Sequence, residues 1–142
     1  MIIDSSAVIA VLDEDCAEHE IVATAIEGLE GPLVVSPLVV AELDFMLSKK
    51  LGRRAAEKFN DDVVLGAYEL ASWTPADHAE ALQVARSFNG DDYIGVTDAS
   101  NVVLADRYRT TRIATLDQRH FRKLQPIWGP DYFTLIPFDP IP

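Results

Sequence analysis

Short apolar runs alternate with longer amphipathic segments along the whole chain. The apolar runs, each bounded by polar or turn-forming residues, predict strands at 1–4, 33–35, 68–73, 112–116 and 133–136. Apolar residues at three- and four-residue intervals predict helices at 5–13, 17–29, 37–50, 53–65, 75–88 and 96–108. A further short helix containing Phe121 and Leu124 is expected, and residues 89–92 predict a polar loop.

Strands that alternate with helices in this way are typical of a mostly parallel sheet with helices on both faces. We therefore predict an α/β fold, a three-layer α/β/α sandwich whose central sheet has four to five short strands. A chain of 142 residues is long enough to bury a hydrophobic core. Residues 1–142 are accordingly expected to form a single domain.

The composition is that of a globular protein, with 49% hydrophobic and 25% charged residues. The single cysteine, Cys16, excludes an internal disulfide and fits a reducing compartment. The sequence shows neither a secretory signal nor an apolar run approaching the roughly 20 residues of a membrane span. We therefore expect a cytoplasmic protein without membrane association.

The charged residues are unevenly distributed. The formal net charge of −11 argues against general electrostatic attraction to nucleic acid. Residues 1–48 contain ten acids and neither Lys nor Arg. Most of the basic residues gather in two clusters, Lys49, Lys50, Arg53, Arg54 and Lys58, and then Arg107, Arg109, Arg112, Arg119, Arg122 and Lys123. This distribution fits a metal site flanked by phosphate contacts, and it fits an ordinary acidic surface equally well.

Three acids stand where a strand ends or a helix begins. Asp4 and Asp117 each follow an apolar strand, and Asp98 lies near the start of the helix predicted at 96–108. The carboxyl ends of parallel strands meet at one edge of the sheet, where open α/β folds bind ligands. Taken singly, each of the three is also well explained as a helix cap.

Glu42 lies within the predicted helix 37–50 on an apolar face. Leu38 precedes it by four residues, and Phe45 and Met46 follow by three and four, so all share one face. A carboxylate on such a face is costly unless a partner or a metal satisfies it. An arginine from another helix would serve as well as a metal ion.

As a group, Asp4, Glu42, Asp98 and Asp117 predict a metal site. Carboxylates beside one sheet edge repel one another, which raises some of their pKa values. Divalent cations would supply the missing positive charge, and oxygen ligands without His or Cys favour Mg²⁺ or Mn²⁺ over zinc. One or two such cations lower the pKa of bound water and stabilise a leaving oxygen. The expected reaction class is therefore phosphodiester hydrolysis.

Two hydroxyl residues lie close in sequence to two of the acids. Ser6 and Thr115 each lie two residues from an acid, Asp4 and Asp117 respectively. Their hydroxyls are suited to orient these carboxylates or a metal-bound water. Local capping is the alternative role for both.

Four segments, MIIDSSAVIAVL, VVSPLVVAELDFML, IGVTDASNVVLADRY and IATLDQRHF, occur in an order and spacing that match a known family. The chain resembles PIN-domain proteins, and specifically the VapC-type ribonuclease toxins of bacterial toxin–antitoxin pairs. The likeness covers nearly the whole chain. That family often has Thr where this chain has Ser6, so the hydroxyl is retained.

The resemblance implies an Mg²⁺- or Mn²⁺-dependent endoribonuclease that acts as a toxin and inhibits translation. Its catalytic and metal-binding acids would be Asp4, Glu42, Asp98 and Asp117. The resemblance also implies a homodimer and a small antitoxin protein that inserts a segment at or near the active site. Transfer RNA, ribosomal RNA and messenger RNA are all open as substrates.

An enzyme of this net charge needs local contacts to RNA phosphates. The candidates, which follow the Glu42 helix or flank Asp117, are Lys49, Arg53, Arg112 and Arg119. A solvated rim and an antitoxin-facing patch are alternative roles for them. Surface or capping roles, rather than metal binding, are expected for His19, His78 and His120.

Two other functions compete with the ribonuclease. A haloacid-dehalogenase-like phosphatase also begins with an Asp after a strand, but it needs a second Asp two residues later. This chain has Ser6 at that position. A non-catalytic PIN-like binding module would be favoured by the loss of one of the four acids, and none is missing.

Overall fold

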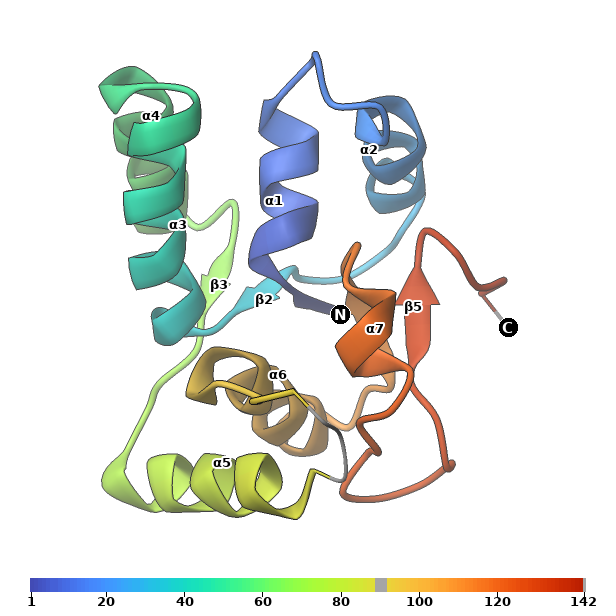
Figure 1. Cartoon of the computed structure of the whole chain (residues 1–142). Coiled ribbons are helices and arrows are strands. Elements are labelled where there is room, and N and C mark those ends of the chain that lie inside the picture. Colours follow the sequence, from blue (N-terminus) through green and yellow to red (C-terminus); the bar gives the residue numbers. More distant parts are fainter. Residues whose placement is uncertain (89–91, 142) are drawn as a thin grey trace.

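A parallel sheet of five strands is the centre of the fold (Figure 1). The computed structural model describes residues 1–88 and 92–141. The strands are β1 Ile2–Ile3, β2 Val34–Val35, β3 Glu69–Leu70, β4 Arg112–Ala114 and β5 Thr134–Ile136. The helices are α1 Ser5–Leu12, α2 His19–Glu27, α3 Pro37–Lys50, α4 Arg53–Val64, α5 Pro75–Ser87, α6 Val96–Arg107 and α7 Gln118–Phe121.

The predicted α/β fold is confirmed, and the elements differ from the expected ones mainly at their ends. Helix α3 has the expected bounds, Pro37–Lys50, because Ser36 caps it by accepting a hydrogen bond from the Leu38 amide at 3.2 Å. Helix α7 ends at Phe121, so Leu124 lies beyond it. Of the expected loop at 89–92, residues 89–91 lie outside the described residues.

The strand order β3-β2-β1-β4-β5 places β1 in the middle of the sheet. The chain first builds outward from β1 through β2 to β3, and then returns to the other side of β1 for β4 and β5. The order of the strands therefore reverses between β1 and β4. In open α/β sheets the crevice at such a reversal, outside the carboxyl ends of the strands, is where ligands bind.

Alternate residues of each strand face opposite layers of helices. Ile3 and Val35 pack in the core beneath α1–α4, whereas Ile2 and Val34 pack in the core against α6. The register Ile2↔Ile113 and Ile3↔Ala114 continues this division into β4. Figure 1 shows the two layers, with α1–α4 above the sheet and α5 and α6 below it.

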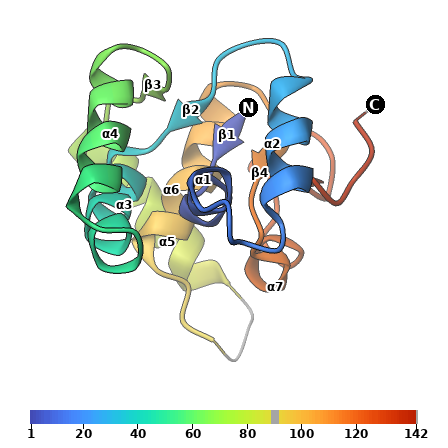
Figure 2. The same cartoon turned by 90° about the horizontal axis from the view of Figure 1, so that it is seen from above.

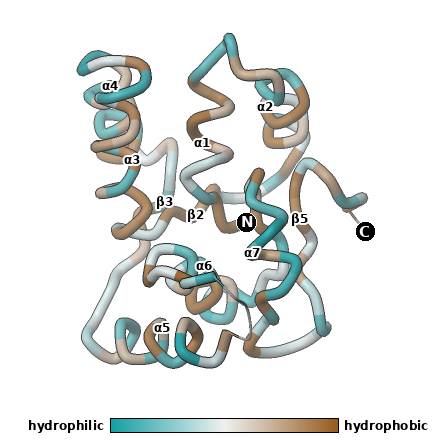
Figure 3. The backbone as a smooth tube through the Cα atoms, viewed as in Figure 1, coloured by the Kyte–Doolittle hydropathy of each residue, from teal (hydrophilic) through white to brown (hydrophobic). Residues whose placement is uncertain are grey.

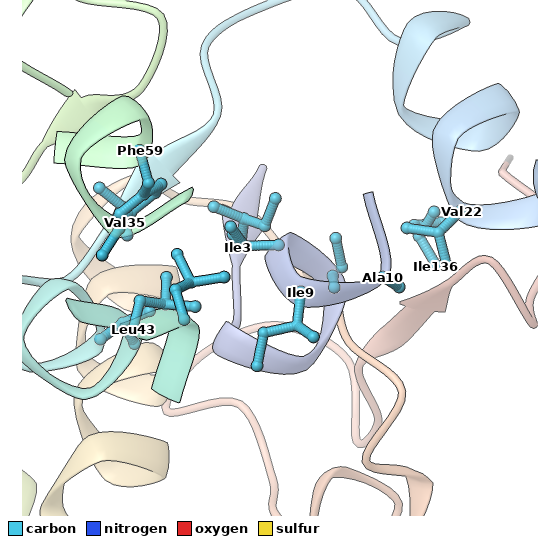
Figure 4. Close-up of a cluster of buried hydrophobic side chains, with 14 residues drawn as sticks. Ile3, Ile9, Ala10, Val22, Val35, Leu43, Phe59 and Ile136 are labelled. Carbon is cyan, nitrogen blue, oxygen red and sulfur yellow. The ribbon is translucent and has the colours of Figure 1, made fainter. Parts of the chain in front are cut away.

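Helix α1 lies over β1 at the centre of its layer, with α2 on one side and α3 and α4 on the other (Figure 2). Its residues Ala7 to Ala10 are buried. In the close-up, Leu43 and Phe59 lie with Val35 on one side of α1, and Val22 lies beside Ile136 on the other (Figure 4). Phe59 is completely buried and meets Tyr68 edge-on.

Helix α6 is covered on nearly all sides. Every residue from Ala99 to Ala105 is buried, including the polar Ser100 and Asn101. By contrast, the segment around α7 is largely hydrophilic (Figure 3), although His120 and Phe121 of this helix are buried. No helix in the described part of the chain combines the length and the apolar character that crossing a membrane requires.

Phe59→Ala is expected to lower the free energy of unfolding by about 3–5 kcal/mol, because it removes a completely buried ring from the α1–α4 core. Val64→Ala, on the same helix but 85% exposed, is expected to change it by less than about 0.5 kcal/mol. Urea unfolding followed by circular dichroism measures both. Equal effects of the two substitutions would show that this core is packed differently.

Candidate metal centre

Asp4 is a buried carboxylate at the carboxyl end of β1, with 3% of its surface exposed. It occupies the N-cap position of α1, yet its side chain makes no capping hydrogen bond. Its Oδ2 instead accepts hydrogen bonds from Ser6 Oγ at 2.8 Å and Thr115 Oγ1 at 2.9 Å. Its Oδ1 accepts one from Asn101 Nδ2 at 3.2 Å. Donors from three elements thus fix the orientation of this carboxylate.

The register of the sheet explains why these groups meet. Ile3 pairs with Ala114, and the Asp4 amide donates to the Ala114 carbonyl at 2.9 Å. The residues that follow this pair, Asp4 and Thr115, therefore lie side by side. Ser6 Oγ also accepts from the Leu116 amide at 2.9 Å, which ties the end of β4 to the first turn of α1.

Asp98 and Asp117 come together from different elements. Asp98 lies in the first turn of α6, and Asp117 is the N-cap of α7, where its Oδ1 accepts from the His120 amide at 3.0 Å. One oxygen of each acid and one nitrogen of His120 all lie within 4.8 Å of one another. This places two of the predicted acids in one small group.

The pKa of Asp98 is raised from 3.8 to about 6. Burial contributes most to the rise, followed by the negative charges of Asp4, Asp117 and then Glu42, while His120 opposes it. The other three predicted acids therefore all act electrostatically on Asp98, as expected for carboxylates gathered at one edge.

Glu42 approaches the group from α3 but stands outside its tight centre. Its charge is the weakest of the three acidic influences on Asp98, and it is half-buried. The expected apolar face around it is only partly buried, because Phe45 is 64% exposed. The start of α3 is held against α6 by Ser36 and Ser100, whose buried hydroxyl oxygens lie 2.7 Å apart.

His120 does not have the surface or capping role expected for it. The residue is 8% exposed and its ring packs edge-on against Phe88. Its Nδ1 lies 2.9 Å from Asp117 Oδ2 and 3.2 Å from Asp98 Oδ2. The group of atoms that could hold a metal ion therefore includes a histidine nitrogen, which the predicted ligand set of four acids did not contain. The available sequence signal for this position was that His120 follows Asp117 by three residues, which places the two side chains within one helical turn.

Asn101 is a second residue that sequence reasoning missed. It is completely buried, three residues after Asp98 on α6, and it donates to Asp4. Its Oδ1 has no hydrogen-bond partner among the described residues. An amide within the apolar run from Ala99 to Ala105 was the available signal, because a buried polar group needs a partner.

The four predicted phosphate contacts do not lie together. Arg119, on α7, pairs with Asp92 at 3.2 Å. Lys49 lies two turns beyond Glu42, about 10 Å along the axis of α3, and Arg53 pairs with Glu57. Arg112 begins β4, near the Met1 amine, whose pKa is lowered by burial and then by the charge of Arg112. Arg112 therefore lies at the amino ends of the strands, whereas Asp117 lies at their carboxyl ends.

The donor groups fit a hard divalent cation. Among the described residues, neither Asp4 nor Asp98 nor Asp117 forms an ion pair with a lysine or arginine. Carboxylate oxygens suit Mg²⁺ and Mn²⁺. A cation held by Asp98 and Asp117, beside Asp4 and Glu42, would neutralise charge that no lysine or arginine of the described chain neutralises.

Known proteins are similar to this chain in sequence and in fold. The PIN domain family model matches residues 1–125. Ribonuclease VapC26 from Mycobacterium tuberculosis is 44% identical over 137 residues, which are 96% of this chain and all of that protein.

Two solved structures resemble the fold. A crystal structure of Mycobacterium tuberculosis VapC20, described as a toxin that cleaves the sarcin-ricin loop, has a TM-score of 0.75 at 15% identity and covers 82% of this chain and 88% of its own. The FitAcB structure from Neisseria gonorrhoeae has a TM-score of 0.56 at 17% identity, covering 82% and 86%. At these identities the likeness concerns the fold.

Asp98→Asn is expected to stabilise the metal-free protein at pH 7.5 by about 1–3 kcal/mol. Since the folded-state pKa of about 6 exceeds the unfolded value of 3.8, the folded protein binds more protons between these values. The stability of the native protein therefore falls as pH rises from about 4 to 7, and the advantage of the Asp98→Asn variant grows over the same range. Urea unfolding in EDTA across this range measures it.

Asp61→Asn is the control for this experiment, because Asp61 is exposed on α4. The substitution is expected to leave the pH dependence unchanged. A pH-independent difference between the native protein and Asp98→Asn would contradict the raised pKa of Asp98.

Thr115→Val is expected to lower the free energy of unfolding by about 1–3 kcal/mol. It keeps the shape of the side chain but removes the hydroxyl that donates to Asp4 and accepts from the Asp117 amide at 3.0 Å. Thr24→Val, at an exposed position of α2, serves as the matched control. Equal unfolding midpoints for the two variants would argue against this network.

Proposed function

The chain belongs to the PIN-domain family, in its VapC group, and we propose that it is a metal-dependent endoribonuclease, the toxin of a toxin–antitoxin pair. The observation that carries the proposal is the group formed by Asp98, Asp117 and His120 beside Asp4, whose acids have no lysine or arginine partner among the described residues, at the strand reversal between β1 and β4. The 44% identity to a ribonuclease over 96% of the chain supports the same activity.

In this proposal Asp98, Asp117, Asp4 and Glu42 hold the cation. A bound divalent cation lowers the pKa of water for attack on phosphorus and neutralises charge on the phosphodiester. Ser6, Thr115 and Asn101 keep the Asp4 carboxylate in one orientation, so that it is preorganised before the substrate arrives. The acids themselves attract the cation and repel a free phosphate, which ties RNA binding to cation binding.

RNA contacts are proposed at basic residues on the same side as the acids. Arg119 lies next to His120 on α7, and Lys49 shares a face of α3 with Glu42. Arg112 lies at the amino end of β4, away from the acids, and is not part of this proposed surface. A cognate antitoxin that inhibits the protein, a homodimeric assembly and an inhibitory effect on translation follow from the resemblance to VapC-type toxins.

The phosphatase alternative is disfavoured by the surroundings of Asp4. A phosphatase of that kind needs an acid where this chain has Ser6, and the Ser6 hydroxyl donates to Asp4. Both oxygens of Asp4 accept hydrogen bonds, which holds the carboxylate in place and makes it a poor nucleophile. The contacts thus support a fixed ligand rather than an attacking group.

RNA cleavage tests the proposal directly. Protein freed of any bound partner is expected to cut total RNA with Mg²⁺ or Mn²⁺ and to stop cutting in EDTA. Asp4→Asn and Asp98→Asn are each expected to reduce the rate by about a hundredfold or more, because each removes a charged ligand. Gel analysis with mapping of the new RNA ends measures the rate and the cleavage site.

Asp61→Asn is again the control and is expected to cleave RNA at the native rate. If the native protein binds no divalent cation and leaves RNA intact under these conditions, the ribonuclease proposal fails. If it cleaves RNA equally well in EDTA, the metal dependence fails.

A further inference from the structure

His120 is placed where a ligand of the cation would be. Its Nδ1 lies 2.9 Å from Asp117 Oδ2 and 3.2 Å from Asp98 Oδ2. Ligands at neighbouring positions around an octahedral cation, each about 2.1 Å from it, are about 3 Å apart. Both distances from Nδ1 therefore match the spacing of ligands around one ion.

The lack of hydrogen bonds between the His120 ring and the described residues also supports a ligand role. Neither ring nitrogen makes a hydrogen bond to any described residue, although the ring is buried and Nδ1 is close to two carboxylates. A single N–H on Nδ1 satisfies one acceptor at most. A cation between the three atoms satisfies the nitrogen and both oxygens together.

The surroundings hold the ring in this position. Asp117 uses Oδ1 to cap α7, which leaves Oδ2 facing His120 Nδ1. On the far side of the ring, Asp92 Oδ2 lies 3.9 Å from Nε2, and Arg119 holds Asp92. A carboxylate on the side of the second nitrogen is the usual companion of a metal-bound histidine, where it orients the ring.

We propose that His120 is a nitrogen ligand of the divalent cation, through Nδ1, together with Asp98 and Asp117. This inference rests on the proposed metal-dependent function and deepens it. Imidazole suits transition-metal ions, whereas Mg²⁺ prefers oxygen ligands and binds through water and carboxylates. The site consequently prefers Mn²⁺ to Mg²⁺.

A different role for His120 would be that of an internal cation that pairs with Asp98 and Asp117. The two roles make opposite predictions for His120→Gln. Loss of a ligand lowers the affinity for Mn²⁺ about tenfold to a hundredfold, with a smaller effect on Mg²⁺. Loss of a competing internal cation raises the affinity for both ions.

Electron spin echo spectroscopy of Mn²⁺ bound to the unmodified protein tests the ligand without a substitution. Coupling to ¹⁴N is expected, and it is expected to change to the ¹⁵N pattern when the protein is labelled with ¹⁵N-histidine. His120→Gln is expected to lose the coupling, and His78→Gln to keep it, because His78 lies at the start of α5 beside Trp73. Circular dichroism checks that both variants fold.

Calorimetric titration with Mn²⁺ and with Mg²⁺ completes the test. Tight Mn²⁺ binding without nitrogen coupling, or higher affinity for both ions in His120→Gln, would overturn the role of His120 and leave the proposed ribonuclease intact. If the native protein binds neither ion, the proposed function and this inference fail together.

Discussion

The burial of acidic groups at one sheet edge, with no lysine or arginine partner among the described residues, is the constraint on which the structure of this protein depends. Asp4 is nearly inaccessible to water, and its charge is balanced by hydrogen bonds alone among the described residues. Burial and the neighbouring acids likewise raise the pKa of Asp98. Such a cluster costs stability, and proteins retain this kind of local conflict at functional sites.

The rest of the fold brings the members of this cluster together from distant parts of the sequence. The β1–β4 register sets Asp4 beside Thr115, 111 positions apart. Helix α6 supplies Asp98 and Asn101 from one face, since they are three residues apart. The same helix contacts the start of α3 through Ser100, so that α6 links the Glu42 helix to the acids. The buried polar residues of α6 thus belong to the site as much as to the core.

Sequence patterns were sufficient to predict the α/β fold and to select four acids that the structure brings near one another. Their role as metal ligands stays a prediction. Each acid lies at a position that the local sequence pattern can identify, namely the end of an apolar strand, the start of a helix or an apolar helix face. The signals for Asn101 and His120 were weaker, because the residues that they contact come from other elements and only the tertiary structure brings them together. Arg112 is a different case. It begins the predicted strand that Asp117 follows, and a strand of five residues spans about 16 Å. The pattern therefore already placed Arg112 and Asp117 at opposite ends of that strand.

The charge distribution constrains how an acidic chain of this kind meets a polyanion. Several of its arginines are committed to ion pairs, with partners Asp77, Asp106, Asp139 and Glu57. These pairs neutralise the surface locally and leave little field to attract RNA over a distance. Attraction must therefore arise at the site itself, where a divalent cation among the acids reverses the local sign of charge. Under the proposed function, the same carboxylates that repel a phosphodiester in the metal-free protein position it once the cation is bound, which makes the cation a condition for substrate binding as well as for chemistry.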